Sequence, residues 1–463
     1  MFDAKVYQER RKKLRSKIDT GLAFFLGNTE APMNYPANTY PFRQDSSFLY
    51  FFGLDHPDLA GIIDFDEDKD YIYGDDLTID DIIWMGPQPT ISERAKKAAV
   101  ENTAPLAKLE EKLKEAIKKG RKIHILPPYR SLNKIRLEGY LGIPYNKMNN
   151  FVSEELIKAV VSLRSVKDQF EIEEIDKTLK NITYDMHVAY MKMAKPDIVE
   201  QEIAGYIEGI ALRQGGRVAY PVILSRDGQT LHNHFHGNRL KKGDLLLNDS
   251  GAESPMRYAT DITRTVPVGG KFTQKQKEIY EIVLKTEMDC IETVQAGITY
   301  KSVHLQAAKI IANGLKDLGI MKGNVDEAVE KGAYALFMPH GLGHMMGLDV
   351  HDMEDFGEKY VGYDENTTRS TQFGLGALRL GRTLQPGFIL TVEPGIYFIP
   401  ELIDIWKNEK KFEEYLNYSK IEEYKDFGGI RIEDDVLVTE NGREILGKSI
   451  PKKVEDVENI MNS

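Results

Sequence analysis

The sequence predicts an α+β protein of two domains, an N-terminal α/β domain over residues 1–165 and a C-terminal domain over residues 166–463. Length is the first reason, because single hydrophobic cores stop growing at about 250–300 residues and this chain has 463. The second reason is a change of pattern along the chain. Strand-length apolar runs first alternate with amphipathic segments, which is typical of α/β domains; later, groups of helices are followed by pairs of strands.

The N-terminal elements follow from composition and period. Residues 5–18 carry Lys and Arg throughout, which predicts an exposed first helix. Four apolar runs end on turn residues, so we predict strands at Leu22–Leu26, Phe48–Phe52, Leu59–Phe65 and Ile123–Leu126. Residues 105–119 place apolar side chains on one face and Lys and Glu elsewhere, which indicates an amphipathic helix with a solvated basic face.

The C-terminal domain opens with a long helix. Its core stripe is Ile172, Ile175, Leu179, Ile182 and Met186, and Pro196 ends the pattern. We interpret His187, beside that stripe, as structural. Further helices are expected at 202–213, from Thr273 to near Gly297 with Cys290 buried inside it, and from Ser302 to near Gly319. Strands are expected at 243–250, 259–268, 388–398 and 429–438.

Composition excludes several classes of function. A net charge of −11 argues against non-specific binding to nucleic acid, which needs a basic surface. No apolar run reaches the ~20 residues of a membrane span. The single cysteine fits a reducing compartment, and the first residues lack the apolar core of a signal peptide, so we expect a cytoplasmic protein.

Acidic residues interrupt four of the predicted strands. Asp249 ends an apolar run, and Asp261 lies on the returning segment, so a hairpin brings the two together. Glu393 and Glu433 interrupt two later strands in the same way. For any one of them a salt bridge at the surface is the alternative. If they meet, however, four carboxylates cannot all stay ionised close together, and two divalent cations would supply the missing charge.

The segment from Pro339 to Asp352 carries three histidines among glycines, His340, His344 and His351. A neutral imidazole is a common metal ligand and a ready acid or base. The alternative is a glycine-rich loop whose histidines only bind backbone carbonyls. Added to the four acids, His344 would make an oxygen-rich set with one nitrogen, which suits Mn²⁺ first and Zn²⁺, Co²⁺ or Fe²⁺ as alternatives.

These motifs, in this order, resemble those of the pita-bread-fold metallopeptidases related to creatinase and methionine aminopeptidase, and within them the aminopeptidase P and prolidase branches. The matching pieces are the strand ending at Asp249, Asp261-Ile-Thr-Arg-Thr, His340-Gly-Leu-Gly-His344, Leu348-Asp-Val-His351-Asp, Val392-Glu393-Pro-Gly and Arg431-Ile-Glu433-Asp-Asp. Residues 42–50 are similar to the signature of the non-catalytic domain that precedes the catalytic domain in those two branches. The likeness covers nearly the whole chain and implies a pita-bread catalytic domain.

The resemblance also implies roles for single residues. Its five ligands for two divalent ions are Asp249, Asp261, His344, Glu393 and Glu433, with Asp261 and Glu433 bridging both ions. A metal-bridging hydroxide would be the nucleophile and Glu393 its proton shuttle. His340 and His351 would line the substrate site, where His351 stabilises the developing oxyanion. Tyr397 and Arg431 match positions behind the ligands or on the substrate side.

The histidine-rich segment Leu231–Gly237 matches a place where the family usually has one substrate-contacting histidine. Counting back from Asp249 favours His232 over His234 for that role, and we expect His236 to contact solvent. On a strand all three would share one face and could form an adventitious metal site.

Two long segments, 353–380 and 399–427, and a slightly longer hairpin near Pro255 depart from the compact bacterial members of the family. We interpret the long segments as shaping the cleft or an oligomer contact.

We therefore expect a Xaa-Pro aminopeptidase whose substrates are peptides with proline at the second position. The first alternative is a Xaa-Pro dipeptidase (prolidase) with the same centre. The second is a non-catalytic peptide- or protein-binding module on the same fold, which the complete ligand set argues against. Family members often form dimers or tetramers, so a homodimer or homotetramer is expected.

Overall fold

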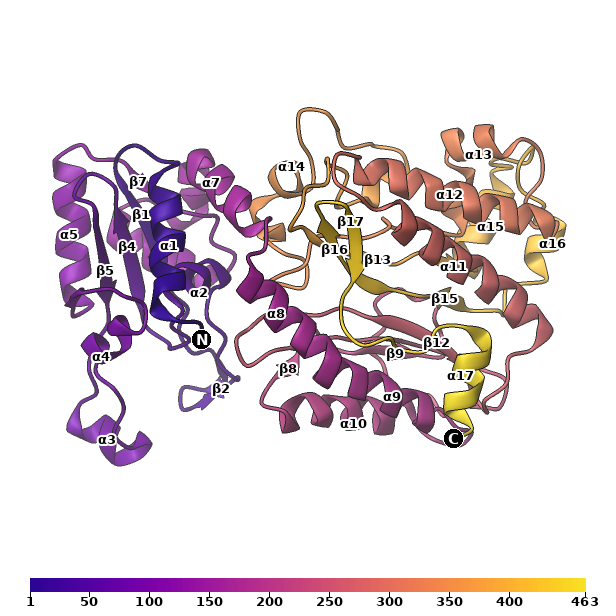
Figure 1. Cartoon of the computed structure of the whole chain (residues 1–463), viewed down its shortest axis with the longest axis horizontal. Helices are drawn as coiled ribbons and strands as arrows, with labels where there is room; N and C mark the ends of the chain where they lie inside the picture. Colours follow the sequence, from indigo (N-terminus) through magenta and orange to yellow (C-terminus); the bar gives the residue numbers. More distant parts are fainter. The chain divides into compact units, whose positions relative to one another are not determined.

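The computed structural model describes all residues from 1 to 463, and the chain divides into two compact units. The N-terminal unit consists of Met1–Arg164 and Met353–Tyr360, and the C-terminal unit of Ser165–Asp352 and Val361–Ser463 (Figure 1). The sequence gives no sign that a segment as late as 353–360 groups with the N-terminal unit. No helix in the structure combines the length and the apolar character that crossing a membrane requires.

The N-terminal unit is a mixed five-stranded sheet with helices, in the strand order β6-β5-β4-β1-β7. Its strands are β1 (Leu22–Leu26), β2 (Pro32–Tyr35), β3 (Asn38–Thr39), β4 (Ala60–Asp64), β5 (Lys69–Tyr73), β6 (Asn102–Ala104) and β7 (Ile123–His124). Its helices are α1 (Ala4–Arg15), α2 (Ser46–Phe52), α3 (Ile79–Met85), α4 (Ile91–Lys96), α5 (Ala107–Lys118), α6 (Ser131–Leu141), η1 (Tyr145–Phe151), α7 (Glu154–Arg164) and, in the late segment, η4 (Glu354–Phe356) and α14 (Glu358–Val361). The apolar face of α5 packs with β1 and β4 in one core, as its period predicts.

Two predictions for this unit are wrong. The run Phe48–Phe52 is not a strand but the helix α2, which the Asp45 carboxylate caps by accepting from the Phe48 N–H at 2.9 Å and which ends at Gly53 with φ of 61°. Every residue of α2 is buried, so its apolar run has no period that would separate helix from strand. Helix α1 is not exposed all round either, because Arg11 is fully buried and donates to the Phe51 carbonyl oxygen at 2.7 Å.

The C-terminal unit is built from small antiparallel sheets and long helices. Its strands are β8 (Arg217–Val218), β9 (Ile223–Ser225), β10 (Leu245–Asp249), β11 (Ala252–Glu253), β12 (Thr263–Pro267), β13 (Ile389–Val392), β14 (Gly395–Tyr397), β15 (Gly429–Arg431), β16 (Asp434–Thr439) and β17 (Gly442–Ile445). Its helices are α8 (Gln169–Thr178), the π-helix η2 (Leu179–Thr183), α9 (Tyr184–Met193), α10 (Glu200–Arg213), α11 (Gln274–Thr293), α12 (Tyr300–Asp317), α13 (Val325–Lys331), η3 (Ala333–Leu336), η5 (Leu375–Ala377), α15 (Pro400–Asn408), α16 (Tyr418–Glu422) and α17 (Val454–Met461).

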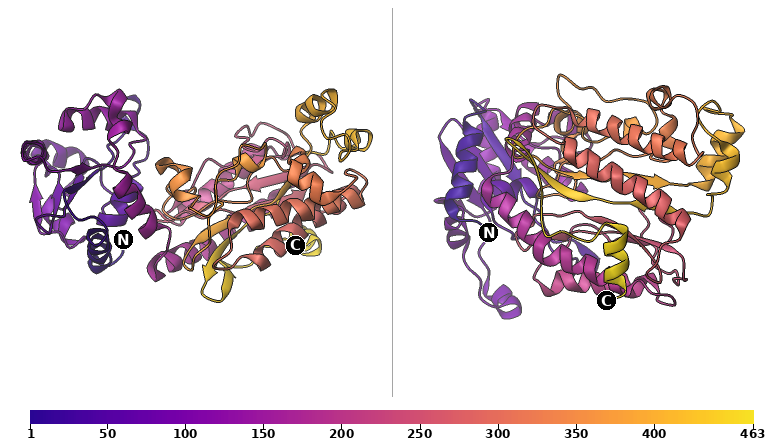
Figure 2. Two further views of the ribbon diagram at one scale, coloured as in Figure 1. Left: turned by 90° about the horizontal axis from the view of Figure 1, so that it is seen from above. Right: turned by 45° about the vertical axis from the view of Figure 1, so that its right-hand side comes forward.

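The arrangement of this unit follows from its apolar faces. Helices α11 and α12 pack side by side, and α11 lies against β13, β14 and β15 (Figures 1 and 2). The predicted capping box of α11 is present, with Thr273 as its N-cap, and Cys290 is buried. The long predicted helix is continuous through α8, η2 and α9. The mixture of helix and sheet, with strands in antiparallel pairs, confirms the predicted α+β class.

The strands expected at 388–398 and 429–438 are each two strands in different sheets. Strand β13 pairs with β16, whereas β14 pairs with β15. The first break falls at Glu393-Pro394 and the second at Ile432-Glu433. Proline lacks the N–H of a ladder bond, so Pro394 cannot continue β13 as a central strand. Both breaks therefore coincide with an acidic residue of the predicted ligand set.

Two buried histidines in this unit are structural. The Nε2 of His187 lies 3.0 Å from the Ser250 carbonyl oxygen, and the Nε2 of His304 lies 2.9 Å from the Tyr334 hydroxyl. Burial lowers the pKa of His187 to about 4 and the pKa of His304 to about 3. Both side chains are therefore neutral in the folded protein, and His187 has the structural role that the sequence indicates.

We expect acid to destabilise the C-terminal unit through these histidines. An unfolded chain protonates histidine near pH 6.5, whereas the folded chain resists protonation of His187 down to a pKa of about 4. The free energy of unfolding should therefore fall as the pH drops below 6.5, by up to about 1.4 kcal/mol per pH unit for each histidine. Thermal unfolding midpoints measured across this range should decline less steeply in His304→Gln than in the wild type. A slope equal to that of a control substitution at the exposed His234 would contradict this.

Candidate metal centre

Four carboxylates reach the same place from the ends and breaks of strands. Asp249 is the last residue of β10, and Asp261 stands two residues before β12. The two strands form the predicted antiparallel hairpin, with Asp249 opposite Thr263. Glu393 and Glu433 come from the two strand breaks described above. The backbone N–H of Glu433 donates to the Thr263 carbonyl oxygen at 3.1 Å, which ties the second break to the hairpin.

The centre of the cluster is Asp261, His344 and Glu433, whose potential ligand atoms all lie within 4.8 Å of one another. The His344 Nε2 is 3.3 Å from an Asp261 carboxylate oxygen and 3.7 Å from a Glu393 carboxylate oxygen. Thr263 donates to Glu433 at 2.6 Å, and Thr391 donates to Glu393 at 3.3 Å. Threonine hydroxyls thus orient two of the four carboxylates.

The His344 ring is oriented as a metal ligand would be. Its Nδ1 lies 3.1 Å from the Met345 carbonyl oxygen, which can only accept, so this nitrogen carries the proton. In the neutral ring the Nε2 lone pair then faces the Asp261 and Glu393 carboxylates. A lone pair directed at anionic oxygens is favourable when a cation lies between them, and a backbone carbonyl behind the ring is the usual support of a ligating histidine.

Asp249 lies at the edge of the cluster, between the Arg431 guanidinium and the Tyr220 hydroxyl. Arg431 donates from Nη2 to one of its carboxylate oxygens at 2.5 Å, and the Tyr220 hydroxyl donates to the other at 2.5 Å. The Tyr220 hydroxyl is also within hydrogen-bonding distance of Asp261. It therefore joins the two aspartates of the hairpin.

The close approach of the buried carboxylates shifts their pKa values. Burial is the main cause that raises the pKa of Glu393; His344 and Arg431 lower it, Asp261 and Asp249 raise it, and the net value is about 7. Burial, together with the surrounding carboxylates, also raises the pKa of Asp261 and holds the pKa of Glu433 well above its usual range. Burial acts to lower the pKa of His344, but its contact with Asp261 and the charge of Glu393 raise it overall.

The cluster thus lacks positive charge, and its donor set fits a pair of divalent cations. The Arg431 guanidinium is already paired with Asp249, and the charge of Arg379 also acts on Glu393. Two divalent ions would balance four carboxylates, and ligands that are mostly carboxylate oxygens with one imidazole suit ions of hard to borderline character.

His340, Tyr397 and Arg431 form one chain of hydrogen bonds. The His340 Nδ1 lies 2.7 Å from the Gly341 carbonyl oxygen and therefore carries the proton, so its Nε2 accepts from the Tyr397 hydroxyl at 2.9 Å. The same hydroxyl accepts from Arg431 Nη1 at 2.8 Å. Because Arg431 also binds Asp249, this chain connects His340 to the carboxylate cluster.

His351 lies close to the cluster. The His351 ring centroid is 3.9 Å from that of His344. Burial lowers the pKa of His351 to about 2, and the charges of His344 and Arg379 add to this effect. The His232 residue is exposed as a whole, yet partial burial of its ring lowers its pKa, and its charge interactions include those with Asp249 and Arg431.

The segment that carries His232 is not a strand, so the idea of three histidines on one face does not apply. No regular element lies between Ser225 and Leu240. His236 is half-buried, and its Nε2 lies 3.1 Å from the Val222 carbonyl oxygen, so the predicted contact with solvent is only partial. That contact points His236 back into the base of the loop.

Three residues of the site do not follow from the motif reasoning, namely Tyr220, Thr263 and Thr391. The two threonines had a signal, since each stands two residues from a ligand candidate (Asp261 or Glu393), where extended backbone presents both side chains on the same face. Tyr220 lies ahead of β9 with no pattern around it, so no signal in the sequence could have found it.

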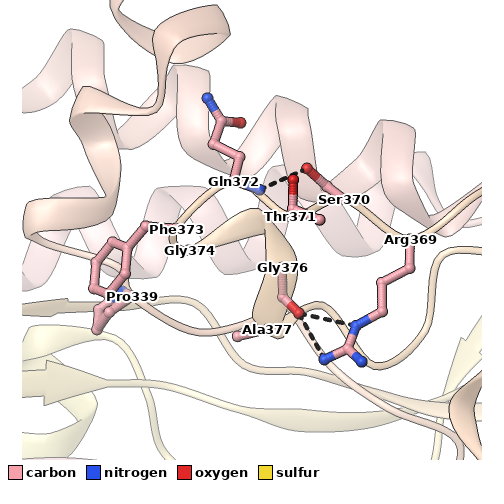
Figure 3. Close-up of a pocket in the computed structure, with 9 residues that line it drawn as sticks. All are labelled: Pro339, Arg369, Ser370, Thr371, Gln372, Phe373, Gly374, Gly376 and Ala377. Atoms are coloured by element: carbon pink, nitrogen blue, oxygen red, sulfur yellow. Dashed lines mark hydrogen bonds between the residues drawn. The ribbon is translucent and has the colours of Figure 1, made fainter.

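A pocket of about 610 Å³ lies next to the His340 loop (Figure 3). Its lining residues are Pro339, Arg369, Ser370, Thr371, Gln372, Phe373, Gly374, Gly376 and Ala377. Arg369 donates from Nε and Nη2 to the Gly376 carbonyl oxygen at 3.2 and 3.0 Å, which closes the 369–376 loop on itself. The pocket is thus mostly built by the long segment 353–380, and only Pro339 comes from the loop that bears His340.

Comparison with known proteins agrees with this centre. Residues 177–440 match the model of metallopeptidase family M24, and residues 7–126 match that of the aminopeptidase P N-terminal domain. Human Xaa-Pro dipeptidase (Homo sapiens) is 32% identical over 98% of this chain and 91% of its own length. A probable Xaa-Pro aminopeptidase of Sordaria macrospora is 32% identical over 97% of this chain and 93% of its own.

Solved structures give the same result. A variant of Escherichia coli aminopeptidase P in complex with substrate superposes with a TM-score of 0.82 at 29% identity, over 100% of this chain and 98% of that one. The E. coli enzyme with the inhibitor Pro-Leu gives a TM-score of 0.81 at 28% identity over the same shares. The fold, the acid–histidine cluster and these matches together show that the chain belongs to metallopeptidase family M24, in the pita-bread-fold group of Xaa-Pro aminopeptidases and prolidases.

Proposed function

We propose that this protein is a dinuclear-metal aminopeptidase that hydrolyses the Xaa-Pro bond at the N-terminus of peptides. The observation that carries the proposal is the cluster in which Asp261, Glu393 and Glu433 surround His344, with Asp249 joined to Asp261 through the Tyr220 hydroxyl. These five side chains would hold two divalent ions, Mn²⁺ first, and three of them, Asp261, His344 and Glu433, already bring their ligand atoms within 4.8 Å of one another. When bound, the ions supply Lewis-acid chemistry that activates water and polarises the scissile carbonyl.

Glu393 is the residue to which we assign the movement of the proton. A general base must lie within reach of the water that it deprotonates, and a Glu393 carboxylate oxygen lies 3.7 Å from the His344 Nε2, on the side of the ring where the ions would bind. The Thr391 hydroxyl holds one of its carboxylate oxygens at 3.3 Å. Glu393 would accept the proton of the attacking water and deliver it to the nitrogen of the leaving proline.

We assign substrate contacts to His351, His340 and His232. His351, stacked near His344, would donate a hydrogen bond to the oxyanion that develops at the scissile carbonyl. Tyr397 and Arg431 would set the position of His340, since they hold its Nε2 through the chain of hydrogen bonds described above.

A Xaa-Pro dipeptidase is the second candidate, favoured by the match to human Xaa-Pro dipeptidase over nearly the whole chain. The two activities share the centre and differ in whether the cleft accepts a chain that continues after proline. Relatives of both names match equally well, so the choice needs an experiment.

The deciding experiment is product analysis by mass spectrometry. Mn²⁺-loaded protein is incubated with a Xaa-Pro dipeptide and, separately, with a Xaa-Pro-Yaa-Zaa peptide. We expect release of the first residue from the longer peptide. Cleavage of the dipeptide alone would show a prolidase, and no cleavage of either peptide with any divalent ion would contradict both candidates.

A further inference from the structure

The loop 226–238, which carries His232, is closed at its base by one carboxylate that belongs to a different element. Glu200 is the first residue of α10, and its side chain is fully buried, with 0% exposed. Its Oε1 accepts from the Arg226 backbone N–H at 2.8 Å and its Oε2 from the Asn238 backbone N–H at 3.3 Å. One side chain thus binds both ends of the loop.

Further contacts make this a built arrangement. The Asn238 side-chain amide donates to Glu200 Oε1 at 3.2 Å and to Asp227 at 3.2 Å. The helix backbone also takes part, since the N–H of Glu200 donates to the Asn238 carbonyl oxygen at 3.0 Å. Together these bonds form a ring between the start of α10 and the two ends of the loop.

Hydrogen bonds from N–H donors, and not an ion pair, stabilise the buried Glu200 carboxylate. No basic side chain forms an ion pair with Glu200, although it is fully buried. A buried carboxylate accepts only, so three N–H donors can converge on it without conflict. A glutamine of the same shape carries an NH₂ group in place of one oxygen, and that group would face a backbone N–H.

The clamped loop lies against the elements of the centre. Gly228 approaches the backbone of β15 so closely that a Cβ there would be 2.7 Å from the Gly429 carbonyl oxygen. Gly429 and Arg431 belong to the same strand. Glu200 therefore holds the two ends of the loop, at Arg226 and Asn238, and Gly228 contacts the strand that carries Arg431. His232 lies inside this loop.

We propose that Glu200 is a positioning residue for His232, holding the loop so that this histidine reaches the substrate. This inference rests on the proposed function, in which His232 contacts the peptide. Glu200 touches no substrate itself and acts only through the loop.

The test uses the full-length Mn²⁺-loaded protein and three variants, Glu200→Gln, His232→Ala and the two combined. Glu202→Gln is the matched control, because Glu202 is exposed on the same turn of α10 and accepts only from the Val199 N–H. We expect Glu200→Gln to lower kcat/KM by about 10- to 100-fold, the range for a displaced contact group, and Glu202→Gln to leave it nearly unchanged. The double variant should be no worse than His232→Ala alone.

A second readout is independent of activity. Hydrogen–deuterium exchange of the amides of residues 226–238 should be faster in Glu200→Gln than in the wild type and unchanged in Glu202→Gln. Should Glu200→Gln fail to fold, Asn238→Ala replaces it in the same comparison with His232→Ala and the double variant. It removes the side-chain amide that donates to Glu200.

The outcomes separate the two ideas. If the single effects multiply in the double variant, or if exchange of the loop does not change, Glu200 does not position His232, while the proposed function stands. If the wild type cleaves no Xaa-Pro peptide, the proposed function fails and this inference fails with it, whatever the exchange data show.

Discussion

Replacement of Glu393 by Gln is expected to lower kcat by about 10³-fold or more while the fold is kept. The substitution preserves the shape of the side chain and removes its ability to accept a proton. Glu393 lies at the break between β13 and β14, and one of its carboxylate oxygens is 3.7 Å from the His344 Nε2. The measurement is steady-state kinetics on a Xaa-Pro peptide at saturating Mn²⁺.

The matched control for this variant is Glu440→Gln, the same chemical change at an exposed turn after β16. Its kcat should equal that of the wild type. Metal content and thermal unfolding are measured on both variants, so that loss of ions is separated from loss of the proton carrier. Activity of Glu393→Gln within about tenfold of the wild type would refute the role assigned to this residue.

Removal of divalent ions is expected to abolish activity and to destabilise the C-terminal unit. Three of the carboxylates are buried with little compensating charge, so ions that bind the folded chain stabilise it by mass action, by about 3 kcal/mol for each site at a concentration 100 times its dissociation constant. After chelation, titration with Mn²⁺ should restore the thermal midpoint and the activity together, with an end point of two ions per chain.

His344→Ala and His234→Ala separate this centre from an adventitious one. His344 faces the carboxylates, whereas His234 is an exposed residue of the 226–238 loop. The first variant should lose bound metal and the rise in thermal midpoint, and the second should keep both. If His234→Ala loses its metal and His344→Ala binds metal normally, the ions do not bind at the proposed centre, and the proposal is contradicted.

Much of the centre could be predicted from the sequence because its chemistry interrupts regular patterns. Asp249 and Glu393 stand where a run of Val, Leu and Ile would otherwise bury an unpaired charge, and that conflict with solvation is visible without coordinates. The hairpin of β10 and β12, which brings Asp249 and Asp261 to the same end, is a contact between segments near in sequence, so it could be predicted from the apolar run and the returning segment.

Other features depend on contacts between distant parts of the chain. The run Phe48–Phe52 is a helix because Asp45 caps it and all its sides are buried, and a fully apolar run has no period to show this. Tyr220 joins Asp249 and Asp261 only because the segment before β9 folds back over the hairpin. His236 is half-buried because its Nε2 contacts the carbonyl oxygen of Val222, 14 residues earlier in the chain.

The sequence by itself determined the class of the protein and the identity of the acids and histidines, since solvation and residue type are local properties. Only the tertiary structure decided that Glu393 and Glu433 stand at breaks between sheets, that His344 directs its Nε2 at Asp261, and that Arg431 reaches both Tyr397 and Asp249. Those positions depend on how separate strands pair and pack, and strand pairing is a long-range choice that no single segment encodes.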